Sequence, residues 1–261
     1  MPPTLFDSDL RALRRDRAAM KGVETFLYDR AFEDIGERLA SVQRDFRDIL
    51  LVGCPNPQWA GWLRMRGGEG TLRIAEPGAL LAAAAGGRHE REDQLDIEPQ
   101  SVDLVIALGS LESANNLEDA LLRMRLALRP GGLLIGAMAG GDSLRALRGA
   151  MAAADQLRGA TSAHVHPRID PAGLTQLLTN IGLNMPVVDV DRVTARYPSL
   201  AKLVDDLRAM GATNILNARD RRYLGKAAYD AARGHLGNQV DESGKFSETF
   251  DILHFTGWAP A

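Results

Sequence analysis

The sequence predicts an α/β fold built on a doubly wound, mostly parallel sheet. From residue 49 onward, short apolar runs alternate with stretches of helical periodicity, which is typical of repeated strand–helix units. The apolar runs are almost uninterrupted, and strands of that kind need helices on both faces of their sheet. A length of 261 residues with 45% apolar side chains allows one large domain, or one domain with an added part.

Composition excludes several classes of function. The 31 basic and 34 acidic side chains give a net charge of −3, without the excess of Lys and Arg on which a general nucleic-acid binder depends. The N-terminus carries no apolar leader and the chain has no apolar run of membrane-spanning length, so we expect no membrane span and a cytoplasmic location. The single cysteine, Cys54, excludes an internal disulfide, which is compatible with a reducing compartment.

Residues 1–48 predict a region of N-terminal helices. Apolar side chains recur there at steps of three and four residues, which indicates two amphipathic helices with a break near Gly22. The basic residues Arg14, Arg15 and Arg17 are interrupted by Asp16, and we interpret them as a solvated helix face.

Residues 49–141 predict the core of the sheet. One helix, Leu117–Leu128, is ended by Arg129-Pro130-Gly131-Gly132, because proline cannot continue a helix and the glycines permit a tight turn into the next strand. The predicted strands are Ile49–Val52, Leu72–Ala75, Leu104–Leu108 and Leu133–Met138.

Residues 142–261 predict a helical insertion followed by closing strands of the same domain. One strand is expected at Pro186–Val190, and the segment Leu200–Met210 has helical spacing. The tail from Phe250 to Trp258 is rich in residues that favour strands, which indicates a closing strand.

A doubly wound sheet binds ligands beyond the carboxyl ends of its strands. Gly53 follows the first predicted strand, but Pro55 and Pro57 remove two N–H donors from the loop, which excludes the usual glycine-rich cradle. Glu76 ends the second strand, where a carboxylate commonly accepts hydrogen bonds from ribose hydroxyls. Residues 92–96 offer acids to an adenine amino group, with a solvated loop as the alternative.

These features occur in an order that resembles class I methyltransferases, which use S-adenosylmethionine. The order covers residues 49–138, and its most specific parts are Asp103-Leu104-Val105 and Leu128-Arg129-Pro130-Gly131-Gly132. Almost the whole chain is similar to the BioC-like branch, which includes the arginine hydroxylase that assembles mitochondrial complex I. The segments similar to that branch are Phe6-Asp7, Gly136–Leu144, Tyr197-Pro198, Asp206–Gly211 and Gly257–Pro260.

The resemblance implies a Rossmann-like methyltransferase fold and a site for S-adenosylmethionine in the loops after the first three strands. The substrate would be a small molecule or a protein side chain, the protein partner a respiratory complex, and no catalytic residue is assigned. The implied cofactor-binding residues are Gly53, Cys54, Glu76, Asp93 and Leu108, and the implied substrate-binding residues are Gly140, Gly141 and Asp142. For the last three a plain helix N-cap is the alternative.

The sequence departs from the family pattern at the cofactor site. Leu51 stands where the family has an acid, and Pro55 and Pro57 stand where it has glycines. Glu112 and Ser113 take the positions that His and Trp usually fill. Three functions therefore stay open: a methyltransferase that depends on S-adenosylmethionine, a non-catalytic assembly factor that kept the fold, and a protein-arginine hydroxylase.

One further pattern concerns metals. Two histidines and a carboxylate, His164, His166 and Asp170, match the ligand set of a non-haem iron triad. Histidines in a loop more often make local hydrogen bonds, so we expect no metal here. For Cys54 we expect a packing role, because no base or positive charge near it in the sequence would lower its pKa.

Overall fold

The computed structural model describes residues 4–159 and 161–261, so residues 1–3 of the predicted N-terminal region and residue 160 lie outside it. One sheet of seven strands has the order β3-β2-β1-β4-β5-β7-β6. Its strands are β1 (Ile49–Val52), β2 (Leu72–Glu76), β3 (Arg88–His89), β4 (Val102–Leu108), β5 (Leu128–Gly140), β6 (Asn184–Tyr197) and β7 (Phe246–Trp258). The α-helices are α1 (Ser8–Lys21), α2 (Phe26–Ser41), α3 (Gln58–Gly67), α4 (Ala79–Ala85), α5 (Leu117–Ala127), α6 (Arg145–Arg158), α7 (Pro171–Asn180), α8 (Leu200–Ala209) and α9 (Lys226–Gly237).

The strand pairing confirms the doubly wound, mostly parallel sheet. β1 lies inside the sheet and pairs in parallel with β2 and β4, so that Ile49 is opposite Leu72 on one side and Leu104 on the other. β7 runs antiparallel between β5 and β6. Since the strand order reverses beside β1, the carboxyl ends of β1 and β4 form the edge where such folds bind ligands.

Side chains that alternate along the strands build a separate core on each face. Ile49 and Leu51 of β1 point to the face covered by α2 and α3, whereas Leu50 and Val52 point to the face covered by α5 and α7. All of β1 is therefore buried, which explains its uninterrupted apolar run.

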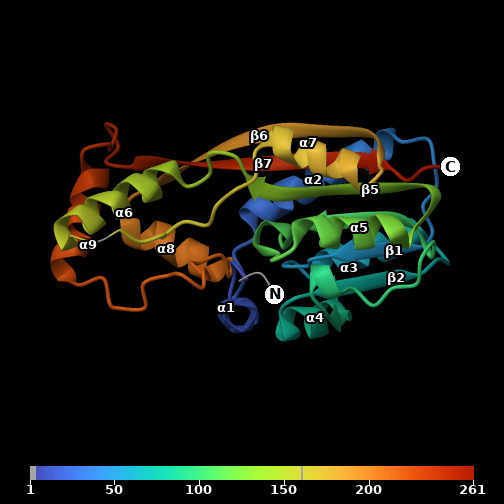
Figure 1. Cartoon of the computed structure of the whole chain (residues 1–261), viewed down its shortest axis with the longest axis horizontal. Coiled ribbons are helices and arrows are strands. Elements are labelled where there is room, and N and C mark those ends of the chain that lie inside the picture. Colours follow the sequence, from blue (N-terminus) through green and yellow to red (C-terminus); the bar gives the residue numbers. More distant parts are fainter. Residues whose placement is uncertain (1–3, 160) are drawn as a thin grey trace.

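Helices α6, α8 and α9 gather beyond the carboxyl end of β5, at the left of Figure 1, while α1 lies below the same edge. The long strands β6 and β7 extend into this group. Glu248 of β7 accepts hydrogen bonds from the backbone N–H groups of Ala146 (3.0 Å) and Leu147 (2.8 Å), which caps the first turn of α6. The sheet and the helical group are thus joined through strand β7.

The predicted elements are present, with some bounds corrected. Helix α5 ends at Ala127 and not at Leu128, because Leu128 already begins β5. The predicted turn over residues 129–132 is therefore part of that strand, as an irregularity where the register with β4 shifts and Gly131 has a φ of +69°. β6 is also longer than the predicted Pro186–Val190, since pairing with β7 continues to Tyr197. The proposed division at residues 48 and 141 stays a prediction.

Among the described helices, we find none with both the length and the apolar character needed to cross a membrane.

Candidate functional site

Helix α1 is fastened at the carboxyl edge of the sheet by the residues that precede it. Asp7 caps the helix, accepting a hydrogen bond from the N–H of Leu10 at 3.0 Å. The backbone N–H of Phe6 donates to Asn115 Oδ1 at 2.8 Å, and the amide of Asn115 donates back to the carbonyl of Phe6 at 3.0 Å. Phe6 is buried against Ile215 and Leu216, so α1 is fixed in place before it reaches the site.

Arg15 of α1 forms a two-pronged ion pair with Glu76 at the end of β2. Its Nε lies 2.6 Å from Oε1 and its Nη2 lies 2.7 Å from Oε2. Nη1 donates to the carbonyl of Gly109 at 2.8 Å, in the loop after β4. Both side chains are buried, and this geometry is the strong, planar form of an Arg–carboxylate interaction.

Two backbone N–H groups complete the surroundings of the Glu76 carboxylate. The N–H of Cys54 donates to Oε2 at 2.7 Å, and the N–H of Gly78 donates to Oε1 at 2.8 Å. A carboxylate offers about four lone-pair positions, and Glu76 thus receives four donors. No acceptor position remains for a ribose hydroxyl.

Arg11 repeats the arrangement one helical turn earlier. Its Nη1 and Nη2 donate to the two carboxylate oxygens of Glu92 at 2.9 and 2.7 Å, and Nη2 also donates to the carbonyl of Ser110 at 2.6 Å. Glu92 is buried and belongs to the acidic segment that the sequence offers to an adenine group. Arg15 therefore occupies the expected ribose acid, Glu76, and Arg11 occupies Glu92, which directly precedes the expected adenine acid, Asp93.

The ion pairs keep these groups charged despite their burial. Burial by itself would lower the pKa of Arg15, but the attraction of Glu76 outweighs it and the pKa is raised. Burial would likewise raise the pKa of Glu92, but the charge and hydrogen bonds of Arg11 lower it below its ordinary value.

The interpretation of the basic residues of α1 as a solvated face is wrong for Arg15, which is buried. Arg14 is half-buried and donates to the carbonyl of Asn214, whereas Arg17 is exposed as expected. The physical reason is that Arg11, Arg15 and Ala18 lie on one face of the helix, and that face meets buried carboxylates.

The glycine turn after β1 is closed. Gly53 has a φ of +83°, and a Cβ built on it would lie 2.2 Å from the carbonyl oxygen of Leu108 and 2.8 Å from Oγ of Ser110. The backbone of the β4 loop therefore occupies the space beside Gly53 where a ligand would approach. Cys54 is buried with its Sγ 3.4 Å from the carbonyl of Asn56, and burial raises the pKa of its thiol to about 12.

These residues do not fit S-adenosylmethionine. The ribose acid, Glu76, has no free acceptor position. The expected adenine acid, Asp93, is paired with Arg91, and its neighbour Glu92 is paired with Arg11. The turn at Gly53 is packed against protein backbone. An adenosyl group would have to displace two arginines that are held by buried ion pairs.

The other predicted site residues have different partners. Asp93, next to Glu92, pairs with Arg91 at 2.8 Å. The space beside Gly140 is filled by Leu253 and that beside Gly141 by Asp251. Asp142 is exposed and pairs with Arg145 at 3.4 Å, and the helix cap considered for it belongs to Glu248. Leu108 lines an adjacent cavity.

The metal triad does not assemble. His164 Nε2 lies 3.0 Å from Asp155 Oδ1, whereas His166 Nε2 accepts a hydrogen bond from the N–H of Ile215 at 3.0 Å. Asp170 caps α7 instead, accepting from Gly173. Over residues 4–159 and 161–261, His, Cys, Asp and Glu form no group of three or more that would hold a metal ion.

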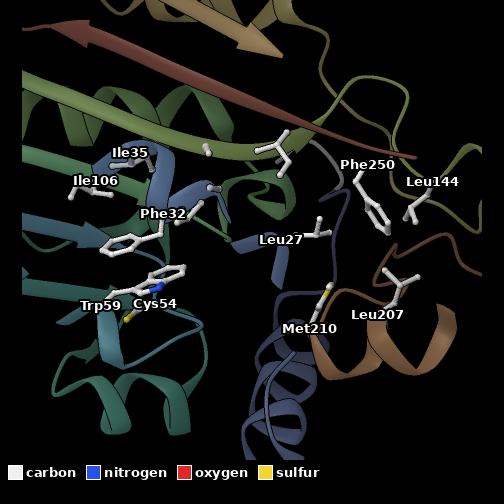
Figure 2. Close-up of a cluster of buried hydrophobic side chains, with 14 of the residues drawn as sticks. Leu27, Phe32, Ile35, Cys54, Trp59, Ile106, Leu144, Leu207, Met210 and Phe250 are labelled. Carbon is white, nitrogen blue, oxygen red and sulfur yellow. The ribbon is translucent and has the colours of Figure 1, made fainter. Parts of the chain in front are cut away.

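A cavity of about 80 Å³ lies next to the two ion pairs. Its walls are largely apolar, and Figure 2 shows Leu144, Leu207 and Phe250 pointing toward one another with Met210 beside them. The polar side chains that reach the cavity include Arg11, Arg15, Tyr28, Glu112, His166 and Arg168. Of these, Glu112 was expected only as a departure from the family pattern. No motif in the sequence indicated a role for Arg11, Tyr28 or Arg168.

The chain is similar to known proteins of one family. A model described as "Methyltransferase domain" matches residues 51–136. The zebrafish (Danio rerio) protein named "Arginine-hydroxylase NDUFAF5, mitochondrial" is 30% identical over 98% of this chain and 83% of its own length. The chain belongs to the methyltransferase family.

Within this methyltransferase family two kinds of relative are found. The human protein with the same name as the zebrafish one is 28% identical over 97% of this chain and 76% of its own length. The malonyl-acyl-carrier-protein O-methyltransferase of Nitrosospira multiformis is 32% identical, but over 65% of this chain and 53% of its own length. The protein of Coxiella burnetii named malonyl-acyl-carrier-protein O-methyltransferase 1 is 28% identical over 97% of this chain and 89% of its own length, so both kinds of relative match nearly the whole chain.

Solved structures confirm the methyltransferase fold. A putative methyltransferase of Bacillus halodurans covers 88% of this chain with a TM-score of 0.57 and 10% identity, and 100% of its own chain is covered. The cyclase SpnF also covers 88% of this chain, with a TM-score of 0.51, 17% identity and 79% of its own chain covered. At these identities the likeness shows the fold alone.

Proposed function

We propose that this methyltransferase-fold protein acts on a protein partner without S-adenosylmethionine, as an assembly factor for a respiratory complex. The observation that carries the proposal is the Glu76 carboxylate, whose acceptor positions are filled by Arg15 and two backbone N–H groups. We include a cytoplasmic location in the proposal.

Energetics support the loss of the cofactor. Breaking a buried ion pair by removing one partner costs about 3–5 kcal/mol, because the other charge stays buried. A ligand that displaced Arg15 from Glu76 would start with that deficit, which corresponds to a Kd weakened by roughly two to four orders of magnitude. Displacement of Arg11 from Glu92 would add to it.

Similarity over nearly the full length is compatible with either kind of relative. Relatives named arginine hydroxylases match 97–98% of this chain, and the O-methyltransferase of Coxiella burnetii matches 97% of it. The choice of a protein partner without the cofactor therefore rests on the filled carboxylate of Glu76.

A complementation experiment tests this function. In a strain of the source organism that lacks the gene, we expect less assembled respiratory complex I on a native gel, and full recovery with the wild-type chain. The double variant Arg15→Met with Glu76→Leu removes the ribose acid together with its partner, and should restore assembly equally. Normal assembly without the gene would overturn the assembly role, and recovery by the wild type but not by a folded double variant would favour a cofactor-dependent activity.

A further inference from the structure

The cavity beside the ion pairs contains two opposite charges that lack partners. Glu112 Oε2 and the Nε and Nη1 atoms of Arg168 are buried, and none of the three makes a hydrogen bond within the described part of the chain. Both side chains line the cavity, yet over residues 4–159 and 161–261 they do not form an ion pair with each other within 4.0 Å. The two charges face the same space and do not meet.

Charges buried in this way need compensation. An unpaired ion in an apolar setting costs several kcal/mol, and proteins normally pair it or neutralise it. Burial lowers the pKa of Arg168, while the nearby carboxylate of Glu112 opposes that effect. A guest that offers a negative group to Arg168 and a positive group to Glu112 would satisfy both.

The remaining charges around the cavity are already balanced. Arg11 and Arg15 are paired with acids, and Asp251 accepts from Arg192 Nε at 2.7 Å. His166 accepts a backbone hydrogen bond on Nε2, and burial lowers its pKa to about 3, so it is neutral. Burial also raises the pKa of Tyr28, which remains a phenol. The cavity therefore requires one positive and one negative group from its guest.

The rest of the cavity limits the size and character of that guest. At roughly 10–15 Å³ for each water, a cavity of about 80 Å³ has room for about five to eight small atoms or groups. The walls away from Glu112 and Arg168 are apolar, with Leu27, Met138 and Phe250 among them. A small apolar chain next to a pair of opposite charges matches these surroundings.

We propose that this cavity binds a free α-amino acid with a small apolar side chain, its carboxylate on Arg168 and its ammonium group on Glu112. Both contacts are charge-assisted hydrogen bonds, which are about twice as strong as neutral ones. A guanidinium group would satisfy Glu112 but would place a second cation beside Arg168. This inference goes beyond the proposed function and does not depend on it.

Calorimetric titration of the full-length wild-type protein with L-alanine, L-2-aminobutyrate and L-valine tests the site, because these amino acids stay within the size limit of the cavity. We expect saturable 1:1 binding of at least one of them. L-Valinamide lacks the carboxylate and 3-methylbutanoate lacks the ammonium group, so each should bind at least about tenfold more weakly than valine. Equal binding of valine and valinamide, or no heat with any of the three amino acids, would overturn the proposal.

Matched variants identify the contacts. Arg168→Gln and Glu112→Gln should each weaken binding of the preferred amino acid at least about tenfold. Arg145→Gln is the control, because that side chain is 78% exposed and pairs with exposed Asp142. Circular dichroism establishes that each variant is folded, and the comparison of valine with its two derivatives needs no variant. Unchanged affinity in both folded cavity variants would rule out this binding mode.

Discussion

Arg15 and Glu76 act as one structural unit, because in the described part of the chain neither side chain forms another ion pair. Arg15→Met should lower the free energy of unfolding by about 3–5 kcal/mol, since Glu76 would be left buried without its counter-charge. Arg17→Met, at an exposed position on the same helix, should change it by less than about 0.5 kcal/mol. Urea unfolding of both variants measures the difference.

The double variant Arg15→Met with Glu76→Leu provides the control for that interpretation. Replacing both charges of a buried pair by apolar groups is often close to neutral, so the double variant should be more stable than Arg15→Met alone. If the two single changes instead add up in the double variant, the ion pair is not the source of the loss.

His166 makes the stability of the protein sensitive to acid. Its pKa is lowered from 6.5 to about 3 by burial, so the unfolded chain binds a proton between these pH values and the folded chain does not. The contribution of neutral His166 to the free energy of unfolding is therefore fully present above about pH 6.5, and it falls as the pH decreases toward 3. Between pH 7 and 5, wild type should lose about 2 kcal/mol more than His166→Asn. Equal losses in unfolding measurements at both pH values would contradict the assignment.

Individual contacts of this kind could not be predicted from the sequence. The spacing of Arg11 and Arg15 does show that they share a helix face. What that face meets depends on where α1 packs, and the anchors are Asn115, Ile215 and Leu216, which lie about 100 to 200 residues further along the chain. The local charge pattern therefore predicted that Arg15 is exposed to solvent, whereas the tertiary fold places Arg11 and Arg15 against buried acids.

At the scale of elements, the turn between β1 and α3 carries a clear test. Gly53→Ala places a methyl group 2.2 Å from the Leu108 carbonyl at a φ of +83°, so it should destabilise the protein by several kcal/mol or prevent folding. Gly61→Ala within α3 meets nothing within 4 Å and should stabilise by up to about 1 kcal/mol. Thermal unfolding compares them.

The two glycine variants also separate a closed turn from an open one. A folded Gly53→Ala protein with wild-type stability would show that the turn has room beside Gly53 in solution, against the packing described for it.

Most elements were predictable because their signals are local. The uninterrupted apolar run of Ile49–Val52 follows from burial on both faces, and its bounds agree with β1. The predicted bounds of β5 and β6 were too short. Pairing with β7, which lies far away in the sequence, extends β6 and the carboxyl end of β5, and pairing with β4 extends the start of β5 to Leu128. Strand length here is a property of the sheet and not of the segment.

For the molecule as a whole, the fold contains two neighbouring features, the closed cofactor site at Glu76 and the adjacent cavity. The family resemblance indicated correctly that Glu76 and the turn at Gly53 lie together, and Pro55 and Pro57 indicated that the turn is unusual. Neither signal revealed that α1 fills the space with its own side chains. The adjacent cavity brings together Tyr28, Glu112 and Arg168, which lie on three separate segments, and no local pattern connects them.

If α1 occupies the cofactor site in solution, the wild-type protein should not bind S-adenosylmethionine. Calorimetric titration should detect no binding up to about 1 mM ligand. Saturable binding at micromolar concentration, lost in a folded Glu76→Gln variant, would show instead that Arg15 leaves Glu76 in solution and that the cofactor site is open.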